Sequence, residues 1–143
     1  MRYLLTTDGS ATSRKAASWL AAHLPVRAQD VLFIIYVFPL PEDVETFQSL
    51  FDLPRDPSDR RVRELASGVF DQTRKALGPW EGTIHEILLL GNPAHEILEF
   101  AATQSIDLIV TGSSGKTPRS EICLGSVSNA LTHRSLSPVL VIR

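Results

Sequence analysis

The chain has 143 residues, of which 43% are apolar and 21% charged, and its formal net charge is −2 at pH 7. These values are typical of one globular domain over residues 1–143, and they exclude a basic nucleic-acid-binding protein and a membrane span, because the longest apolar run covers only residues 31–38. A single cysteine, Cys123, excludes an internal disulfide, and with no signal-like apolar stretch at the start we expect a cytoplasmic protein.

Apolar runs alternate with segments of helical periodicity along the chain. The runs at residues 3–5, 31–38, 87–90, 108–110 and 139–142 are continuous, which predicts strands covered on both faces. Between them, helices are predicted after Ser10, after Pro57, after an Asn92 cap with Pro93 as first residue, and from Ser126 onward. This alternation predicts an α/β fold, an open, mostly parallel five-stranded sheet with helices on both faces, of the Rossmann-like type.

Helical spacing also predicts which side chains face the core. On the first helix the inward side includes Leu20 and Leu24, and on the second it includes Leu65 and Phe70. Gly78 and the proline after it are expected to end the second helix.

The segment of residues 39–57 interrupts the alternation. It contains four prolines, at positions 39, 41, 54 and 57, and five acidic residues: Glu42, Asp43, Glu45, Asp52 and Asp56. Two interpretations stay open: a surface loop with one short amphipathic turn, or a lid or partner-docking surface.

The main functional signal is a pair of glycine-rich turns. Gly112 and Gly115 follow the fourth apolar run, and nine residues separate Gly115 from Gly125, which precedes Ser126 and Ser128. Glycine lets the backbone approach a ligand closely, and a helix that begins with Ser-x-Ser offers hydroxyls and free amides to an anion. The pattern therefore predicts a phosphate site, with a mononucleotide as the leading ligand.

Strand order supports the same position for the site. Asp8 follows the first predicted strand and Gly112 follows the fourth, so both lie at carboxyl ends. In open parallel sheets ligands bind beyond these ends, where the strand order reverses. We expect Asp8 and Gly112 to be neighbours.

Other chemistries fit less well. Gly115, Lys116 and Thr117 resemble the end of a phosphate-binding loop, but Val110 occupies the position where that motif requires a glycine. The four histidines form no i, i+4 pair and have no cysteine partner, so no metal site is predicted. No serine has a recognisable histidine base, so no catalytic residue is predicted.

The spacing Gly112-x-x-Gly115, nine residues, Gly125-Ser126 resembles the ATP-binding signature of the universal stress protein family. Residues 3–10 are similar to the opening strand and turn of that family, and residues 91–97 to its turn into the third helix. Residues 107–112 and 137–142 are similar to its fourth and last strands, so the resemblance covers the whole chain.

This resemblance implies a set of nucleotide-binding residues: Asp8, Val37, Gly112, Ser113, Gly115, Gly125, Ser126, Val127 and Ser128. The residues of the two turns would hold the phosphates, with amides of Gly112, Ser113 and Gly115 on one side and the helix start on the other. Asp8 would lie near the ribose and adenine, and the backbone of Val37 would read the adenine edge. Many nucleotide-binding members have a larger basic or imidazole residue where this chain has Ser114.

The resemblance further implies ATP, or AMP or ADP, as the ligand, with Mg²⁺ or Mn²⁺ on the phosphates, and a homodimer paired through the last strand. The expected function is a nucleotide-dependent stress sensor or adaptor, in which ATP orders residues 116–124 and alters a surface for a protein partner. Two alternatives stay open: a slow ATPase timer in which Asp8 orients water, and an interaction scaffold that binds no nucleotide.

Overall fold

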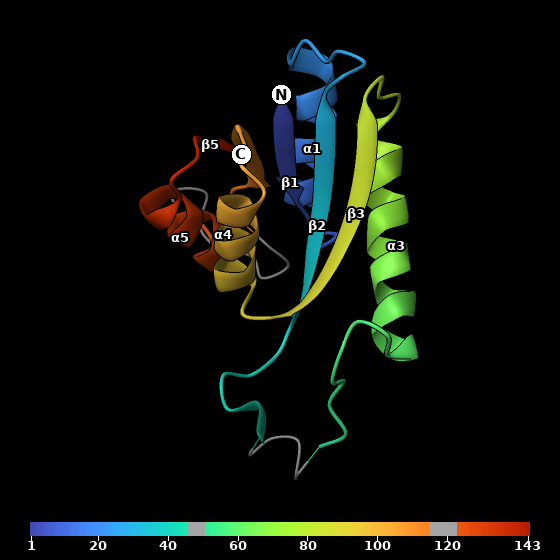
Figure 1. The fold of residues 1–143 in the computed structure, drawn as a ribbon, viewed down its shortest axis with the longest axis vertical. Coiled ribbons are helices and arrows are strands. Elements are labelled where there is room, and N and C mark those ends of the chain that lie inside the picture. The colour runs from blue at the N-terminus through green and yellow to red at the C-terminus, as the bar shows by residue number, and fades with distance from the viewer. Residues whose placement is uncertain (46–50, 115–122) are drawn as a thin grey trace.

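Five parallel strands form one open sheet in the computed structural model, which describes residues 1–45, 51–114 and 123–143. The order across the sheet is β3-β2-β1-β4-β5 (Figure 1). The strands are β1 (Arg2–Thr6), β2 (Val31–Pro39), β3 (Thr83–Gly91), β4 (Leu108–Gly112) and β5 (Val139–Ile142). The predicted five-stranded parallel α/β fold is therefore confirmed.

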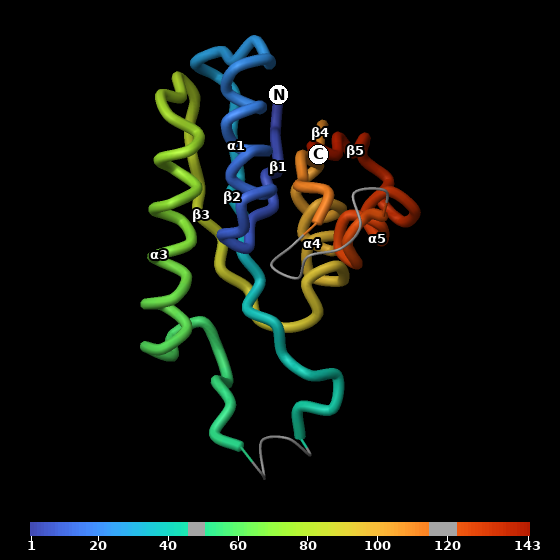
Figure 2. Tube along the Cα trace, turned by 180° about the vertical axis from the view of Figure 1, so that it is seen from behind, coloured from blue at the N-terminus to red at the C-terminus, as the bar shows by residue number. Residues whose placement is uncertain are grey.

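Helices cover both faces of this sheet, as Figures 1 and 2 show from opposite sides. α1 (Ala11–His23) and α3 (Arg60–Leu77) pack on one face, where Leu20 and Phe70 join a core that includes Tyr3. α4 (Pro93–Thr103) and α5 (Ser126–Arg134) pack on the other face, where Ile97 and Leu131 join a second core. Each face of the sheet thus has its own buried cluster.

Local signals in the sequence fix where the helices begin and end. The Ser10 side chain accepts a hydrogen bond from an amide in the first turn of α1, and Asn92 does the same for α4, whose first residue is Pro93. Gly78 ends α3 with a φ of 73°, a conformation that favours glycine. These three predicted boundaries are confirmed.

One inward position predicted from helical spacing is wrong. Leu65 is 45% exposed, because the buried face of α3 runs through Val62, Ala66 and Val69 and leaves Leu65 at its margin. Leu24 packs against the core as predicted, although it lies just beyond the end of α1 as its C-cap residue.

The predicted coverage of every strand on both faces holds only for the centre of the sheet. β1, β2 and β4 are mostly buried, whereas β3 and the first three residues of β5 are half-buried or exposed. The reason is position: β3 and β5 are the two edges of the sheet, and each has one neighbouring strand.

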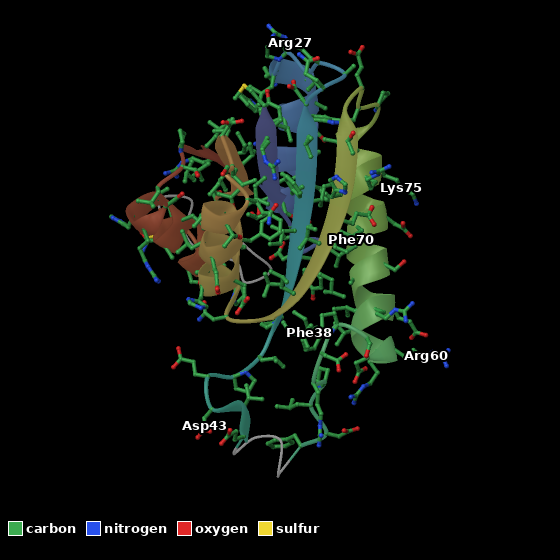
Figure 3. The ribbon with its side chains drawn as sticks, viewed as in Figure 1. Arg27, Phe38, Asp43, Arg60, Phe70 and Lys75 are labelled. Carbon is green, nitrogen blue, oxygen red and sulfur yellow. The ribbon has the colours of Figure 1, made fainter. Side chains whose placement is uncertain are left out.

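Residues 39–45 and 51–58 form an arm that extends beyond the carboxyl end of the sheet (Figure 1). Figure 3 shows Asp43 far out on this arm, whereas Phe70 lies against the sheet and Arg60 points outward from α3. Phe51 is 59% exposed on the arm. The loop and lid interpretations both depend in part on residues 46–50, which lie outside the described residues.

No helix in the described part of the chain is long and apolar enough to cross a membrane.

Two glycines make a matched test of this packing. A Cβ at Gly82 would lie 2.2 Å from the carbonyl oxygen of Asp30, whereas a Cβ at Gly68, within α3, would meet nothing within 4 Å. We expect Gly82→Ala to lower the free energy of unfolding by about 1–3 kcal/mol, because the two backbones must separate. Gly68→Ala should raise it by about 0.5–1 kcal/mol through helix propensity. Urea unfolding checks both, and changes of the same sign would contradict the packing described.

Candidate functional site

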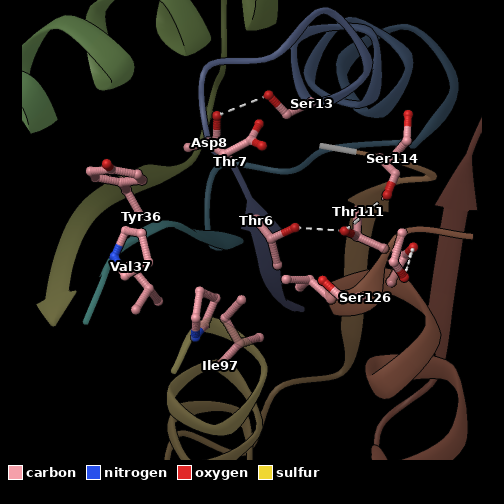
Figure 4. Close-up of a pocket in the computed structure, with 16 residues that line it drawn as sticks. Thr6, Thr7, Asp8, Ser13, Tyr36, Val37, Ile97, Thr111, Ser114 and Ser126 are labelled. Atoms are coloured by element: carbon pink, nitrogen blue, oxygen red, sulfur yellow. Dashed lines mark hydrogen bonds between the residues drawn. The ribbon is translucent and has the colours of Figure 1, made fainter. Parts of the chain in front are cut away.

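The strand order reverses between β1 and β4. β1 pairs with β2 on one side and with β4 on the other, so the connections that leave these strands run in opposite directions. A cavity of about 470 Å³ lies at the carboxyl ends of these strands, in the size range of small-molecule sites (Figure 4). Its described lining residues are Thr6, Thr7, Asp8, Ser13, Tyr36, Val37, Pro39, Pro93, Ile97, Thr111, Gly112, Ser114, Gly125, Ser126, Val127 and Ser128.

One side of the cavity is apolar. Val37 at the end of β2 and Ile97 of α4 lie on this side, opposite Ser114 and Ser126 (Figure 4). Tyr36 borders the same region, and burial, together with the charge of Asp8, raises its pKa above the usual value of 10.0. Tyr36 therefore stays a neutral phenol over the physiological range, and this side offers a wall suited to a flat aromatic ring.

The opposite side is formed by the start of α5. Gly125 is its N-cap residue and provides no side-chain hydrogen bond, whereas α1, α3 and α4 are each capped by a side chain. The amides of Ser126, Val127 and Ser128 belong to the first turn, where a helix has no internal acceptors. They donate no hydrogen bond to another described residue. Partial positive charge therefore faces the cavity.

Ser113 and Ser128 fix that helix start in place. The Ser113 carbonyl accepts hydrogen bonds from the Gly125 amide at 2.6 Å and from the Ser128 hydroxyl at 2.9 Å. The Ser113 amide donates to the carbonyl of Ile142 in β5 at 2.8 Å. The family resemblance implies that the Ser113 amide donates to a phosphate. In this structure that amide already donates to the Ile142 carbonyl, so a phosphate would have to displace this hydrogen bond. Ser113 itself is not among the lining residues.

Gly112 has a packing role beside its predicted one. A Cβ at this position would lie 2.8 Å from the carbonyl carbon of Thr12 and 3.0 Å from the nitrogen of Ser13, both in the first turn of α1. The Thr12 hydroxyl also donates to the carbonyl of Ser114. The turn after β4 and the start of α1 are therefore in direct backbone contact.

Asp8 lies at the end of β1, and one of its carboxylate oxygens accepts a hydrogen bond from the Ser10 amide at 2.9 Å. Asp8 thus shapes the turn into α1 and also lines the cavity, together with Gly112. Both residues therefore lie at one cavity at the reversal of strand order, in line with their predicted places after β1 and β4.

Beneath these groups, the Thr6 hydroxyl donates to that of Thr111 at 2.7 Å, which joins β1 to β4 below the cavity (Figure 4).

The structure brings seven of the predicted residues to the cavity: Asp8, Val37, Gly112, Gly125, Ser126, Val127 and Ser128. Gly115 and residues 116–122 lie outside the described residues, and with them most of the loop that is predicted to be ordered by ATP. Sequence reasoning missed the lining threonines and the apolar pair Pro93 and Ile97. The Pro93 position was recognised as a helix start, and strand order would have placed that start at this edge of the sheet.

The described residues contain no group of three or more histidine, cysteine, aspartate or glutamate side chains that could hold a metal ion. Asp8 is the only carboxylate among the described lining residues. A divalent ion at this site would therefore be held chiefly by phosphate oxygens and water.

Comparisons with known proteins agree on one family. The sequence profile of the universal stress protein family matches residues 1–143. The chain is 34% identical to universal stress protein MJ0531 of Methanocaldococcus jannaschii over 146 residues, covering 99% of this chain and 81% of that protein. It is 32% identical to universal stress protein YxiE of Bacillus subtilis over 148 residues, covering 99% and 98%.

Solved structures have the same fold. Protein MJ0577 of Methanocaldococcus jannaschii superposes with a TM-score of 0.75 at 29% identity, over 99% of this chain and 94% of that one. An Arabidopsis thaliana family protein with AMP bound gives a TM-score of 0.61 at 14% identity, over 99% and 90%. A universal stress protein of Archaeoglobus fulgidus in complex with dAMP gives 0.57 at 18% identity, over 100% and 98%.

The contact between Gly112 and α1 makes a prediction that needs no ligand. We expect Gly112→Ala to lower the free energy of unfolding by about 1–3 kcal/mol, because the added methyl group meets backbone atoms that cannot move aside independently. Ser114→Ala, two residues on, is the control and should change it by no more than about 0.5 kcal/mol. Urea unfolding of both variants is the measurement. An unaffected Gly112→Ala protein would show that the turn does not press on α1.

Proposed function

This chain belongs to the universal stress protein family, and we propose that it binds an adenine nucleotide in the cavity at the carboxyl ends of the strands. The observation that carries the proposal is the start of α5, where first-turn amides without a side-chain cap face a cavity with an apolar opposite wall. Such a helix start attracts the negative charge of a phosphate. The rest of the cavity then has to accommodate a base and a sugar.

The apolar wall suits the base. Val37, Pro93 and Ile97 supply contact area for a planar ring, and the Val37 backbone lies at the end of β2, where it can meet the ring edge. Asp8 lies between this wall and α1, and its carboxylate is a good acceptor for ribose hydroxyls. The volume of about 470 Å³ is in the range that accommodates small-molecule ligands.

Two family structures with bound nucleotide support this choice of ligand, since one contains AMP and the other dAMP. We extend the proposal to ATP and ADP, with Mg²⁺ or Mn²⁺ on the phosphates. The role proposed is that of a nucleotide-dependent stress sensor or adaptor in the cytoplasm, acting as a single domain over residues 1–143 on a protein partner.

The charge at the start of α5 gives a direct test. Ser126 is exposed, is the first residue of α5 and lines the cavity, so it can be replaced without disturbing the core. We expect Ser126→Asp to bind AMP about tenfold more weakly than Ser126→Asn, because the two side chains match in size and differ in charge. Adenosine, which has no phosphate, should bind both variants equally. Calorimetric titration with the two ligands measures this.

Thermal unfolding provides the accompanying check on the wild-type protein. AMP or Mg-ATP at a hundred times its dissociation constant should stabilise the fold by roughly 2.7 kcal/mol. Equal AMP affinities for the Asp and Asn variants would place the phosphate away from α5. If neither adenosine nor any nucleotide stabilises the wild-type protein, the scaffold alternative replaces nucleotide binding.

We also propose that the protein is a homodimer paired through β5. β5 is an edge of the sheet, its residues Val139, Leu140 and Val141 are half-buried, and Leu136 just before it is 95% exposed. Apolar strand edges of this kind are covered in native proteins.

Val141→Lys should convert the dimer to a monomer, because a charged edge resists pairing. Thr132→Lys on the exposed side of α5 is the matched control and should stay dimeric. Light scattering at micromolar concentration distinguishes the two, and a monomeric wild-type protein would contradict the proposal.

A further inference from the structure

A buried pair of hydroxyl groups joins α3 to the turn that carries Asp8. Thr73 of α3 is fully buried, and its Oγ1 lies 2.7 Å from Oγ1 of Thr7, which is 6% exposed and lines the cavity. The other buried positions on this face of α3 are apolar. Valine would fill the same space as Thr73, so the hydroxyl itself calls for an explanation.

The donors in this pair can be assigned from the neighbouring bonds. The Thr73 hydroxyl donates to the carbonyl of Val69, one helical turn back, at 2.8 Å. Its proton is therefore used, so Thr7 donates the 2.7 Å bond, in preference to its longer 3.3 Å contact with Oγ of Ser13. Thr7 Oγ1 in turn accepts from the Gly9 amide at 3.3 Å. The result is a directed chain from the Gly9 amide through Thr7 and Thr73 to α3, in which each bond polarises the next.

The same face of α3 makes two more contacts with this turn. Gly9 has a φ of 77°, and a Cβ there would lie 3.3 Å from Cγ2 of Val69, so the glycine admits α3 at close range. Arg14 donates to the Gly9 carbonyl at 3.0 Å and to Oε1 of Gln72 at 3.3 Å. Val69 and Thr73 of α3 therefore contact residues 7–9 directly, and Gln72 is linked to them through Arg14.

The turn held in this way carries Asp8 between two fixed points. Thr7 is bonded to α3 on one side, and the Ser10 amide is bonded to the Asp8 carboxylate on the other. We propose that Thr73 is a positioning residue that sets the Asp8 carboxylate toward the sugar of the bound nucleotide, through Thr7, although Thr73 itself does not touch the ligand. This inference rests on the proposed nucleotide site.

Replacement of Thr73 separates the hydroxyl from the shape of the side chain. In Thr73→Val the Thr7 hydroxyl loses its acceptor but still has Oγ of Ser13 at 3.3 Å, so the fold has an alternative bond available. Thr73→Ser keeps the hydroxyl and loses only the methyl group. We expect AMP affinity to fall roughly three- to tenfold in Thr73→Val and to stay within about twofold of wild type in Thr73→Ser.

A second comparison tests whether the effect passes through Asp8. In an Asp8→Asn background, Thr73→Val should change AMP affinity by less than about twofold, because the group that it positions has lost its charge. A purely structural role would give the same loss in both backgrounds. Equal losses, or a Thr73→Ser protein as weak as Thr73→Val, would overturn the inference.

Amide hydrogen exchange in the nucleotide-free protein makes the test independent of the proposed function. Thr73→Val should speed exchange at the Gly9 and Ser10 amides, and Thr73→Ser should not. If the wild-type protein binds no AMP, the proposed function fails, while faster exchange at these two amides would still show that Thr73 positions the turn. Unchanged exchange in Thr73→Val would overturn the inference whatever the affinities.

Discussion

The close contact between Gly112 and the first turn of α1 is the constraint on which the rest of the site depends. The strand order reverses between β1 and β4. The chain continues from β1 to β2 and from β4 to β5, toward opposite edges of the sheet. Only a residue without a Cβ fits in this turn, because a Cβ at position 112 would lie 2.8–3.0 Å from backbone atoms of Thr12 and Ser13. The cavity is the space left beside this contact, between the turn, α4 and α5.

Once the strand ends are fixed, electrostatics follow from the helices. α1, α4 and α5 all begin at the carboxyl edge of the sheet, so the positive ends of their dipoles point toward the same region. Ser10 and Asn92 use their side chains to satisfy amides of α1 and α4. Gly125 has no side chain that could accept from the first amides of α5, so these amides are available to another acceptor. This difference, more than the dipoles alone, makes the start of α5 the helix start best suited to an anion.

The sequence predicted most of the fold because its signals are local. Continuous apolar runs mark the strands, and caps such as Ser10 and Asn92 with a stop at Gly78 mark the helices. Leu65 was predicted to be buried but is exposed, because helical spacing shows which side of a helix faces the core but not how wide the buried stripe is. The resemblance brought Ser113 into the site, whereas the bond from its amide to Ile142 depends on strands that meet only in the folded sheet.

The hydroxyl pairs were out of reach of sequence reasoning for a related reason. Thr6 and Thr111 are 105 residues apart, and Thr7 and Thr73 are 66 apart, so no local pattern connects either pair. Successive side chains on a strand point to opposite faces, and accordingly Thr6 bonds to β4 while Thr7 bonds to α3.

Threonine suits positions 6 and 7. Its branched Cβ fits extended backbone as that of valine does, and its hydroxyl can form a directional hydrogen bond that valine cannot form. An apolar pair would pack as well without fixing the orientation of the neighbouring backbone. At the end of β1, where Asp8 follows at once, that orientation decides where a carboxylate points. The polar pairs therefore fix the orientation of the backbone next to the cavity as well as filling the core.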